Sequence, residues 1–232
     1  MKRSTINHHL KRTGEFLNNH NFVLPPWANW TLEDWRISKK DCNAVFQGGL
    51  GWDLTDFGSG AYGDRGLILF TLRNGNPMEP TKTYAEKIMM VDEGQETPRH
   101  FHWNKTEDII NRGGGDLIIE LWNSGPDEEC LDSPVTVMMD AIPRTVGAGE
   151  PIRMSPGMSI TLTTGVYHRF YGAPTKGPVL VGEVSKVNDD NSDNRFFETI
   201  GRFPSIEEDE KPWRLLVGDY RVFLNAGEEK QP

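Results

Sequence analysis

Short apolar runs separated by turn-forming residues dominate the chain from about residue 50 onward. Segments such as Asn74-Gly75-Asn76 punctuate these runs, and a rhythm of short strands and turns is typical of an antiparallel sandwich or barrel. It disfavours a parallel α/β sheet, which needs long crossovers between strands. The runs that we expect to be strands are 67–72, 84–91, 117–122, 135–139, 159–163 and 179–184. The sequence therefore predicts an all-β barrel of the jelly-roll kind.

The first 45 residues differ from the rest because their apolar residues follow a helical period. Three of them recur at roughly helical spacing: Ile6, Leu10 and Leu17. Ser4 or Thr5 can cap the helix that this pattern predicts. A second short helix is expected to start near Thr31, after two consecutive prolines have broken the first pattern. Short N-terminal helices are thus expected beside the barrel.

Length and composition favour one domain. The chain has 232 residues, 36% of them apolar, which is enough for a sizeable core, and neither an internal repeat nor a low-complexity linker divides it. The N-terminal segment holds three large aromatic residues that a free tail would leave in water: Trp27, Trp30 and Trp35. We therefore predict a single domain over 1–232, in which a helical segment, 1–45, packs on a β-barrel core, 50–225.

The charge of the chain argues against nucleic acid as a partner. The 25 Lys and Arg against 34 Asp and Glu give a net charge of −9, which leaves no broad basic surface for a phosphate backbone. The N-terminus lacks the apolar stretch of an export signal, and apolar runs such as 67–70 are far too short to span a bilayer. The sequence thus predicts neither nucleic-acid nor membrane binding.

The two cysteines, Cys42 and Cys130, indicate a reducing compartment. Two cysteines cannot build the dense disulfide framework of a small secreted protein, and these two do not form a Cys-x-x-Cys pair. We therefore expect a cytoplasmic protein.

Histidines carry the strongest chemical signal. His100 and His102 are separated by one residue, so on a strand both imidazoles point to the same face. Glu107 follows shortly afterwards, and His168 comes later in the chain. Three neutral nitrogens and one carboxylate suit a divalent ion such as Mn²⁺, Fe²⁺, Co²⁺, Ni²⁺ or Zn²⁺ and leave positions for a substrate. We predict about one such ion per chain, bound by these four residues.

The spacing around the histidine pair resembles the first metal motif of the cupin family. In that motif a Gly, two His, a Glu and a second Gly stand at fixed intervals, and the chain matches each of these positions. The matching residues are Gly94, His100, His102, Glu107 and Gly114. The resemblance implies a cupin jelly-roll barrel.

The second cupin motif is matched in part. Gly157, Gly165 and His168 fit its pattern, whereas Thr163 replaces the usual Pro and Gly172 the usual Asn. Both departures fall on turn and hydrogen-bonding positions, so the metal ligand His168 is retained.

Wider stretches of the chain resemble the D-lyxose isomerase family of cupins. The similarity implies a single-domain cupin, commonly a homodimer, that uses a divalent metal, typically Mn²⁺, to interconvert an aldose and a ketose. The expected reaction converts D-lyxose to D-xylulose, and D-mannose and D-fructose are a further expected pair. The stretches that carry the similarity are 24–26, 51–53, 84–88, 99–115, 181–190 and 202–210.

Such an isomerisation also needs a cation beside the developing enediolate. Lys87 is our candidate, because it lies in the strand-like run 84–91 on the same alternation as Met89 and Val91. Periodicity leaves open whether that face points inward, since Ile88 and Met90 make the opposite face equally apolar. The family resemblance favours the inward orientation.

A carboxylate must move a proton between C2 and C1 through a cis-enediol. The candidates in family-like segments are Glu183, Asp193, Glu198 and Glu207. Glu207 is our first choice, because it follows a segment, 203–206, that has the composition of buried chain.

Two other functions fit parts of the same pattern. An iron-dependent oxygenase would use a similar set of histidines and a carboxylate with open positions, and oxygen consumption would distinguish it. A non-enzymatic sugar-binding cupin would bind sugars without turnover. The absence of an added DNA-binding or partner domain argues against the second alternative.

Overall fold

The structure, a computed structural model, describes residues 1–232 except 77–80, 190–191, 202–203 and 226–232. Arg202 and Phe203, which begin one of the family-like stretches, and Asp190, which ends another, thus lie outside the described residues. The strands are β1 (Gly51–Thr55), β2 (Leu67–Arg73), β3 (Tyr84–Val91), β4 (Glu96–His102), β5 (Glu107–Gly114), β6 (Leu117–Ser124), β7 (Cys130–Leu131), β8 (Val135–Met139), β9 (Ile142–Val146), β10 (Ile152–Met154), β11 (Ser159–Leu162), β12 (Val166–Gly172), β13 (Val179–Lys186) and β14 (Asn194–Phe196). The α-helices are α1 (Arg3–Asn19), α2 (Leu32–Ser38), α3 (Asn43–Gln47) and α4 (Asp219–Leu224).

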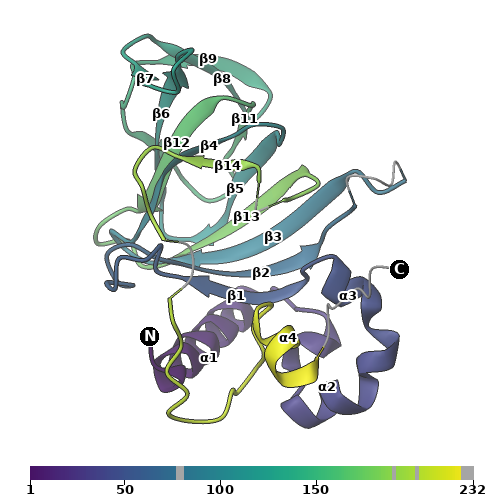
Figure 1. The fold of residues 1–232 in the computed structure, drawn as a ribbon. Helices are drawn as coiled ribbons and strands as arrows, with labels where there is room; N and C mark the ends of the chain where they lie inside the picture. Colours follow the sequence, from purple (N-terminus) through teal and green to yellow (C-terminus); the bar gives the residue numbers. More distant parts are fainter. Residues whose placement is uncertain (77–80, 190–191, 202–203, 226–232) are drawn as a thin grey trace.

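The strands form two curled antiparallel sheets, one of eight strands in the order β1-β2-β3-β13-β5-β11-β8-β9 and one of six in the order β10-β6-β12-β4-β14, with β7 paired to β6. The predicted all-β class with short N-terminal helices is confirmed, and each of the six runs expected to be strands coincides with one (Figure 1). Strand β9 was not predicted. Four of its five residues are exposed, so its sequence lacks the alternation of apolar and polar residues that indicates a strand.

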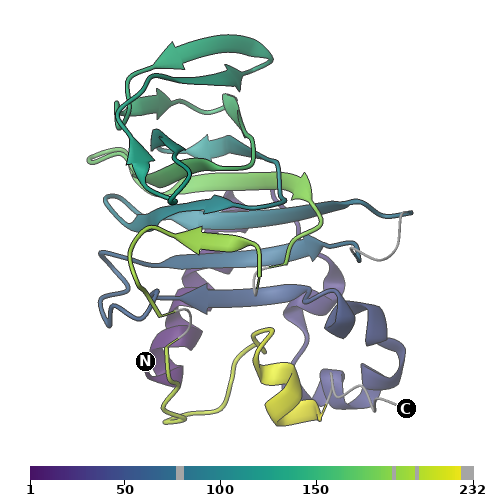
Figure 2. The same cartoon turned by 45° about the horizontal axis from the view of Figure 1, so that its top comes forward.

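Strand β3 separates two apolar cores, which explains why both of its faces are apolar. Met89 and Val91 belong to the core between the two sheets, together with residues of β5, β6 and β13. Ile88 and Met90 face the other way and pack in a second core with α1. Figure 2 shows the helices on the outer side of β1 and β2. Lys87, on the same alternation as Met89, therefore points between the sheets.

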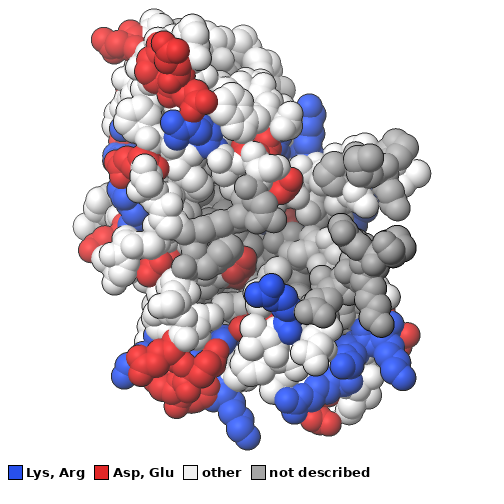
Figure 3. Space-filling model, viewed as in Figure 1, with Lys and Arg blue, Asp and Glu red and all other residues white. Residues whose placement is uncertain are grey.

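Helix α1 begins at Arg3 and is capped by a distant segment. Ser4 and Thr5 lie inside the helix, so the prediction that one of them is the N-cap was wrong. The backbone N–H of Ser4 donates to Asp209, and that of Arg3 donates to the carbonyl of Glu207. Carboxylates at a helix N-terminus are stabilising because they satisfy free N–H groups and oppose the helix dipole. Acidic side chains gather where this segment passes the start of α1 (Figure 3).

Helix α2 follows the local rules that the sequence predicts. Thr31 is its N-cap and forms a capping box with Asp34, in which each side chain accepts a hydrogen bond from the other residue's backbone N–H. Among the described residues, no helix combines the length and the apolar character that a bilayer crossing would need.

Candidate active site

A cavity of about 90 Å³ opens between the two sheets, beside the histidines that the sequence singled out. One ordered water needs only about 10–15 Å³, so the cavity has room for more than a single ion. Both polar and apolar side chains line the cavity. They include His100, His102 and His168, charged groups, and the aromatic residues Phe57 and Phe196. The two motifs, 94–114 and 157–172, meet here because β12 pairs with β4 and places His168 directly opposite His100.

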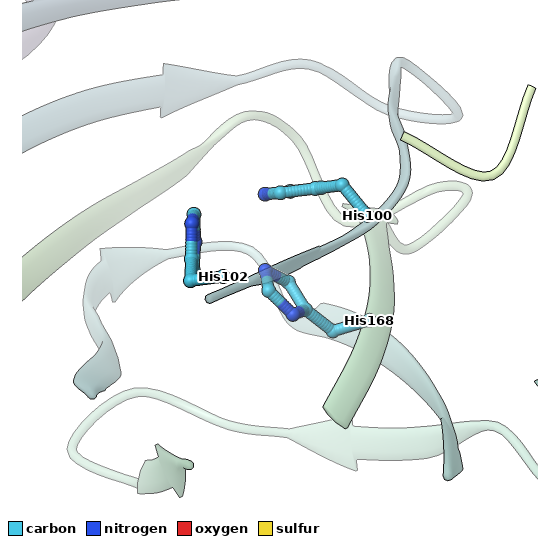
Figure 4. A group of neighbouring side chains, drawn as sticks. All are labelled: His100, His102 and His168. Atoms are coloured by element: carbon cyan, nitrogen blue, oxygen red, sulfur yellow. The ribbon is translucent and has the colours of Figure 1, made fainter. Parts of the chain in front are cut away.

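The three imidazoles converge in the buried interior. His100 and His102 come from β4 and His168 from β12, and Figure 4 shows their rings turned toward one another. One ring nitrogen of each lies within 4.8 Å of one ring nitrogen of the others, and these three residues form a group that could hold a metal ion. The same-face geometry predicted for the His-x-His pair is therefore present.

A β-bulge in β4 sets the direction of His100. Between the pairs His168–His100 and Phe170–Thr97, β4 holds one residue more than β12. The bulge leaves the carbonyl of Pro98 2.8 Å from Nδ1 of His100, and the carbonyl of Val166 lies 3.1 Å from Nδ1 of His168. A carbonyl at Nδ1 requires a proton there, which leaves Nε2 as the ligand atom.

The free atoms of the cluster fit a metal. Nε2 of His168 and both ring nitrogens of His102 are buried and make no hydrogen bond within the described chain. Oε1 of Glu107 lies 3.3 Å from Nε2 of His102 and 3.2 Å from Nε2 of His168. Two ligands about 2.1 Å from one ion and about 90° apart lie about 3 Å from each other, so these spacings suit a shared divalent cation.

The protonation states also suit a metal site. Burial, with the neighbouring His168 and His102, holds the pKa of His100 well below its ordinary value, and burial likewise lowers the pKa of His102. Both rings are therefore neutral at pH 7, as ligation requires. Burial alone would raise the pKa of Glu107, but Lys105 and His102 outweigh it and hold that pKa well below its ordinary value. The ionised carboxylate is the form that binds a cation.

Four buried charged residues form a continuous row of ion pairs, which we call the ladder: Lys87, Glu183, Lys105 and Glu107. Nζ of Lys105 lies 2.7 Å from Oε2 of Glu107 and 2.9 Å from Oε1 of Glu183. Nζ of Lys87 lies 3.4 Å from the same oxygen of Glu183 and donates to Oδ1 of Asn188 at 2.8 Å. Because the charges alternate along the ladder, each buried charge faces an opposite one.

The ladder keeps Glu183 charged. Burial by itself would raise the pKa of Glu183, whereas Lys105 and Lys87 together hold it below its ordinary value. Burial lowers the pKa of Lys87 to about 8, despite the attraction of Glu183. Burial also opposes the charge on Lys105, but Glu107 and Glu183 raise its pKa above the ordinary value.

Lys105 is a site residue that the sequence reasoning missed. It stands in the gap of the first cupin motif, between His102 and Glu107, in the turn that joins β4 to β5. Its place in the sequence, between two candidate metal ligands, was a signal that could have identified it. Only the fold, however, brings Glu183 of β13 to its ammonium group.

Glu207, our first choice for the proton-moving carboxylate, does not lie at this cavity. It is exposed and is not among the described residues that line the cavity. Its backbone exchanges hydrogen bonds with Met1 and Arg3, at the start of the helix that covers the outer face of the sheet. In the segment 207–210, Asp209 accepts the backbone N–H of Ser4 and Glu208 pairs with Arg3, so these acidic side chains bind the start of that helix. Three carboxylates line the cavity among the described residues, those of Asp53, Glu107 and Glu183, and Glu183 is the one that belongs to our four candidates.

The two remaining carboxylate candidates have structural partners. Glu198 is largely exposed and pairs with Arg65. Asp193 is buried, and its two oxygens accept the backbone N–H groups of Asn104 and Lys105. Asp193 therefore fixes the turn that carries Lys105.

The resemblance of the fold to solved structures is broad. An L-ribose isomerase variant from Acinetobacter sp. DL28, in complex with L-ribose, superimposes with a TM-score of 0.59 at 15% identity, over 89% of this chain and 98% of that one. The ligand-free L-ribose isomerase of Cellulomonas parahominis gives a TM-score of 0.58 at 14% identity, with the same coverage of the two chains. These likenesses confirm the predicted cupin-type fold.

Sequence relatives are much nearer. The D-lyxose/D-mannose isomerase of Escherichia coli O157:H7 is 48% identical over 226 residues, which cover 96% of this chain and all of that protein. The D-lyxose/D-mannose isomerase of Serratia proteamaculans is 47% identical over 227 residues, again over its whole length. The family model for D-lyxose isomerase matches residues 1–220, so the resemblance inferred from the sequence is confirmed and the chain belongs to the D-lyxose isomerase family of sugar isomerases.

Proposed function

We propose that this chain is a metal-dependent aldose-ketose isomerase that interconverts D-lyxose and D-xylulose, and D-mannose and D-fructose. The observation that carries the proposal is the meeting of the histidine cluster and the Glu183 carboxylate on one cavity. The two relatives named above support the choice of sugars. D-Lyxose and D-mannose have the same configuration at C2, C3 and C4, so a site that contacts the hydroxyls on these carbons can bind both sugars.

His100, His102, Glu107 and His168 are the proposed ligands, and Mn²⁺ is the proposed ion, with Co²⁺, Fe²⁺, Ni²⁺ and Zn²⁺ as alternatives. Three histidine nitrogens and one carboxylate oxygen suit these divalent ions, and they leave two coordination positions for oxygens of the sugar. When bound, such an ion would supply Lewis-acid polarisation of the carbonyl and hydroxyl oxygens on C1 and C2.

Glu183 is the proposed base. It is ionised and lines the cavity, so its carboxylate can accept the proton on C2 of the aldose. The C2–H electron pair then forms the C1–C2 double bond of a cis-enediol, and the carbonyl oxygen on C1 takes a proton. Return of the abstracted proton to C1, with loss of the hydroxyl proton on C2, completes the ketose.

The lysines have separate roles. Lys105 bridges Glu107 and Glu183 and holds both carboxylates in place. Lys87 reaches Glu183 from the opposite side and lines the cavity, so its ammonium group lies where it can stabilise negative charge on an enediolate oxygen. The inward orientation of Lys87 supports the role that the sequence suggested for it.

A homodimer in the cytoplasm is proposed from the family resemblance. The two cysteines, Cys42 and Cys130, are both free thiols, as a reducing compartment requires. Light scattering coupled to size exclusion tests the oligomeric state, and a monomer at working concentration would contradict the dimer.

The test of the function is turnover of free sugars. Protein stripped of metal and then loaded with Mn²⁺ is expected to convert D-lyxose to D-xylulose, with formation of the ketose followed by NMR. The same reaction in an oxygen electrode should consume no O₂, which separates an isomerase from an oxygenase. If protein loaded with each of the candidate ions binds the sugar but forms no ketose, the chain is a binding protein and the proposal is wrong.

A further inference from the structure

The hydroxyl of Thr97 is a buried polar group for which the fold supplies no partner. The residue is 3% exposed and lines the cavity, and its Oγ1 makes no hydrogen bond within the described residues. A buried hydroxyl without a partner costs stability, and valine would fill the same volume without that cost.

Among the described side chains that line the cavity, the buried atoms without a hydrogen bond belong to three residues: Thr97, His102 and His168. The imidazole nitrogens are the proposed metal ligands, which accounts for their lack of protein partners. A hydroxyl is a poor ligand beside three imidazoles and a carboxylate, and it is well suited to exchange a hydrogen bond with another hydroxyl. The Thr97 hydroxyl is therefore left for the substrate.

The bulge in β4 turns Thr97 toward the cavity. In a regular strand, residues three apart point to opposite faces, so Thr97 and His100 would diverge. The extra residue between them resets the alternation, and both side chains line the cavity. Glu96, the next residue before Thr97, points outward and pairs with Arg65 and Arg169 on the outer surface.

The order of groups along β4 indicates which part of a sugar Thr97 meets. Thr97 precedes the two histidines, and Lys105, which holds Glu183, follows them. The histidines thus lie between the Thr97 end of the cavity and its charged end. C1 and C2 must lie beside the histidines and Glu183, so the rest of the carbon chain extends toward Thr97.

We propose that Thr97 is a specificity-determining residue whose Oγ1 hydrogen-bonds a sugar hydroxyl beyond C2. The proposal rests on the proposed isomerase function. Such a contact would bind a part of the substrate that does not react. The binding energy gained there helps to orient the reacting carbons.

The test compares two conservative variants with a matched control. Thr97→Val keeps the shape and removes the hydroxyl, and it is expected to lower kcat/KM for D-lyxose about 2- to 10-fold, the range for one neutral hydrogen bond. Thr97→Ser keeps the hydroxyl and should stay within about 2-fold of the parent. Thr13→Val removes another buried hydroxyl that has no hydrogen bond in the described chain, but in α1 and away from the cavity lining, and should leave kcat/KM unchanged.

Metal content and melting temperature separate this role from a structural one. Thr97→Val should bind as much Mn²⁺ as the parent and should melt at the same temperature or higher, because it removes an unsatisfied polar group. With the 3-, 4- and 5-deoxy analogues of D-lyxose, the parent and Thr97→Val should react equally fast on the one analogue that lacks the contacted hydroxyl.

Two outcomes would overturn the inference. One is a Thr97→Val enzyme that matches the parent on D-lyxose, and the other is a Val variant that stays slower than the parent on all three deoxy sugars. A parent protein with no isomerase activity would instead overturn the proposed function, so the two failures are distinguishable.

Discussion

Lys87 and Glu183 stand directly opposite each other in the antiparallel pair of β3 and β13, and Nζ of Lys87 lies 3.4 Å from Oε1 of Glu183. Both side chains are almost completely buried. Lys105 approaches the same carboxylate oxygen from the β4–β5 turn, so two cations from separate elements hold one anion. This arrangement places a charged carboxylate inside the protein without leaving it unpaired, which is the condition for using it as a base.

The first prediction concerns the base. Glu183→Gln should lower turnover of D-lyxose on the order of 10²–10⁴-fold, the usual contribution of a positioned general base, while Mn²⁺ content stays at the parent level. Glu207→Gln should turn over at the parent rate, because the backbone of Glu207 bonds to the start of α1 and the residue does not line the cavity. Steady-state kinetics with both variants decide between the two residues. An active Glu183→Gln and an inactive Glu207→Gln would reverse the assignment.

Solvent isotope incorporation checks the route of the proton. Turnover in D₂O should place deuterium at C1 of the ketose whenever the proton on Glu183 exchanges with solvent. Retention of the C2 hydrogen in all products, together with full activity of Glu183→Gln, would indicate a hydride shift instead.

The second prediction concerns the metal. His102→Ala should reduce the bound ion from about one per chain to a small fraction, because it removes one of four ligands from a buried site. The matched control is His8→Ala, which removes an exposed histidine of α1 and should bind the parent amount. Elemental analysis after gel filtration measures the metal content of both variants. Full occupancy in His102→Ala would refute the ligand set.

The third prediction uses the pKa of Lys87, which burial lowers to about 8. Between this value and the unfolded pKa near 10.5, the unfolded state binds more protons than the native state, so Lys87 makes stability rise with pH. Raising the pH from 7.5 to 9.5 should stabilise metal-free parent protein relative to Lys87→Met by on the order of 1–2 kcal/mol. Urea unfolding at both pH values measures this difference. A difference between the two proteins that does not change with pH would contradict the lowered pKa.

The fourth prediction tests whether residues 1–45 belong to the same domain as the barrel. Arg3 is fully buried and donates to both oxygens of Asp219 in α4, which is itself buried. Arg3→Met should therefore lower the free energy of unfolding by about 3–5 kcal/mol, because it leaves a buried carboxylate unpaired. The control is Glu208→Gln, which alters the partly exposed partner of Arg3 and should cost about 1 kcal/mol or less. Equal stability of Arg3→Met and the parent would show that the N-terminal helix is an appendage.

Part of the proposed metal site could be predicted from the sequence, because two of its residues are close together on one strand. His100 and His102 point to one side through strand alternation alone, and Glu107 begins β5 directly after the short turn 103–106, although β5 belongs to the other sheet. His168 needed a second motif, and its place opposite His100 is a pairing of β12 with β4 that no spacing along the chain dictates.

Tertiary structure decided which of the candidate carboxylates lies at the cavity. An acidic cluster such as 207–210 has the same composition whether it serves a reaction or caps a helix, and only the position of α1 shows that it caps one. Lys87 had equally apolar neighbours on both faces of its strand, so its direction depended on a helix packing against one face and a second sheet against the other.

The sequence by itself determined the all-β class, the N-terminal helices and the common direction of His100 and His102, two of the proposed metal ligands. These follow from side-chain alternation and from the short reach of backbone hydrogen bonds. Tertiary structure decided which carboxylate faces the histidines, that Lys105 joins it to Glu107, and that a bulge turns Thr97 into the cavity. Each of these depends on strand register and on the packing of the two sheets, which the spacing of residues along the chain does not specify.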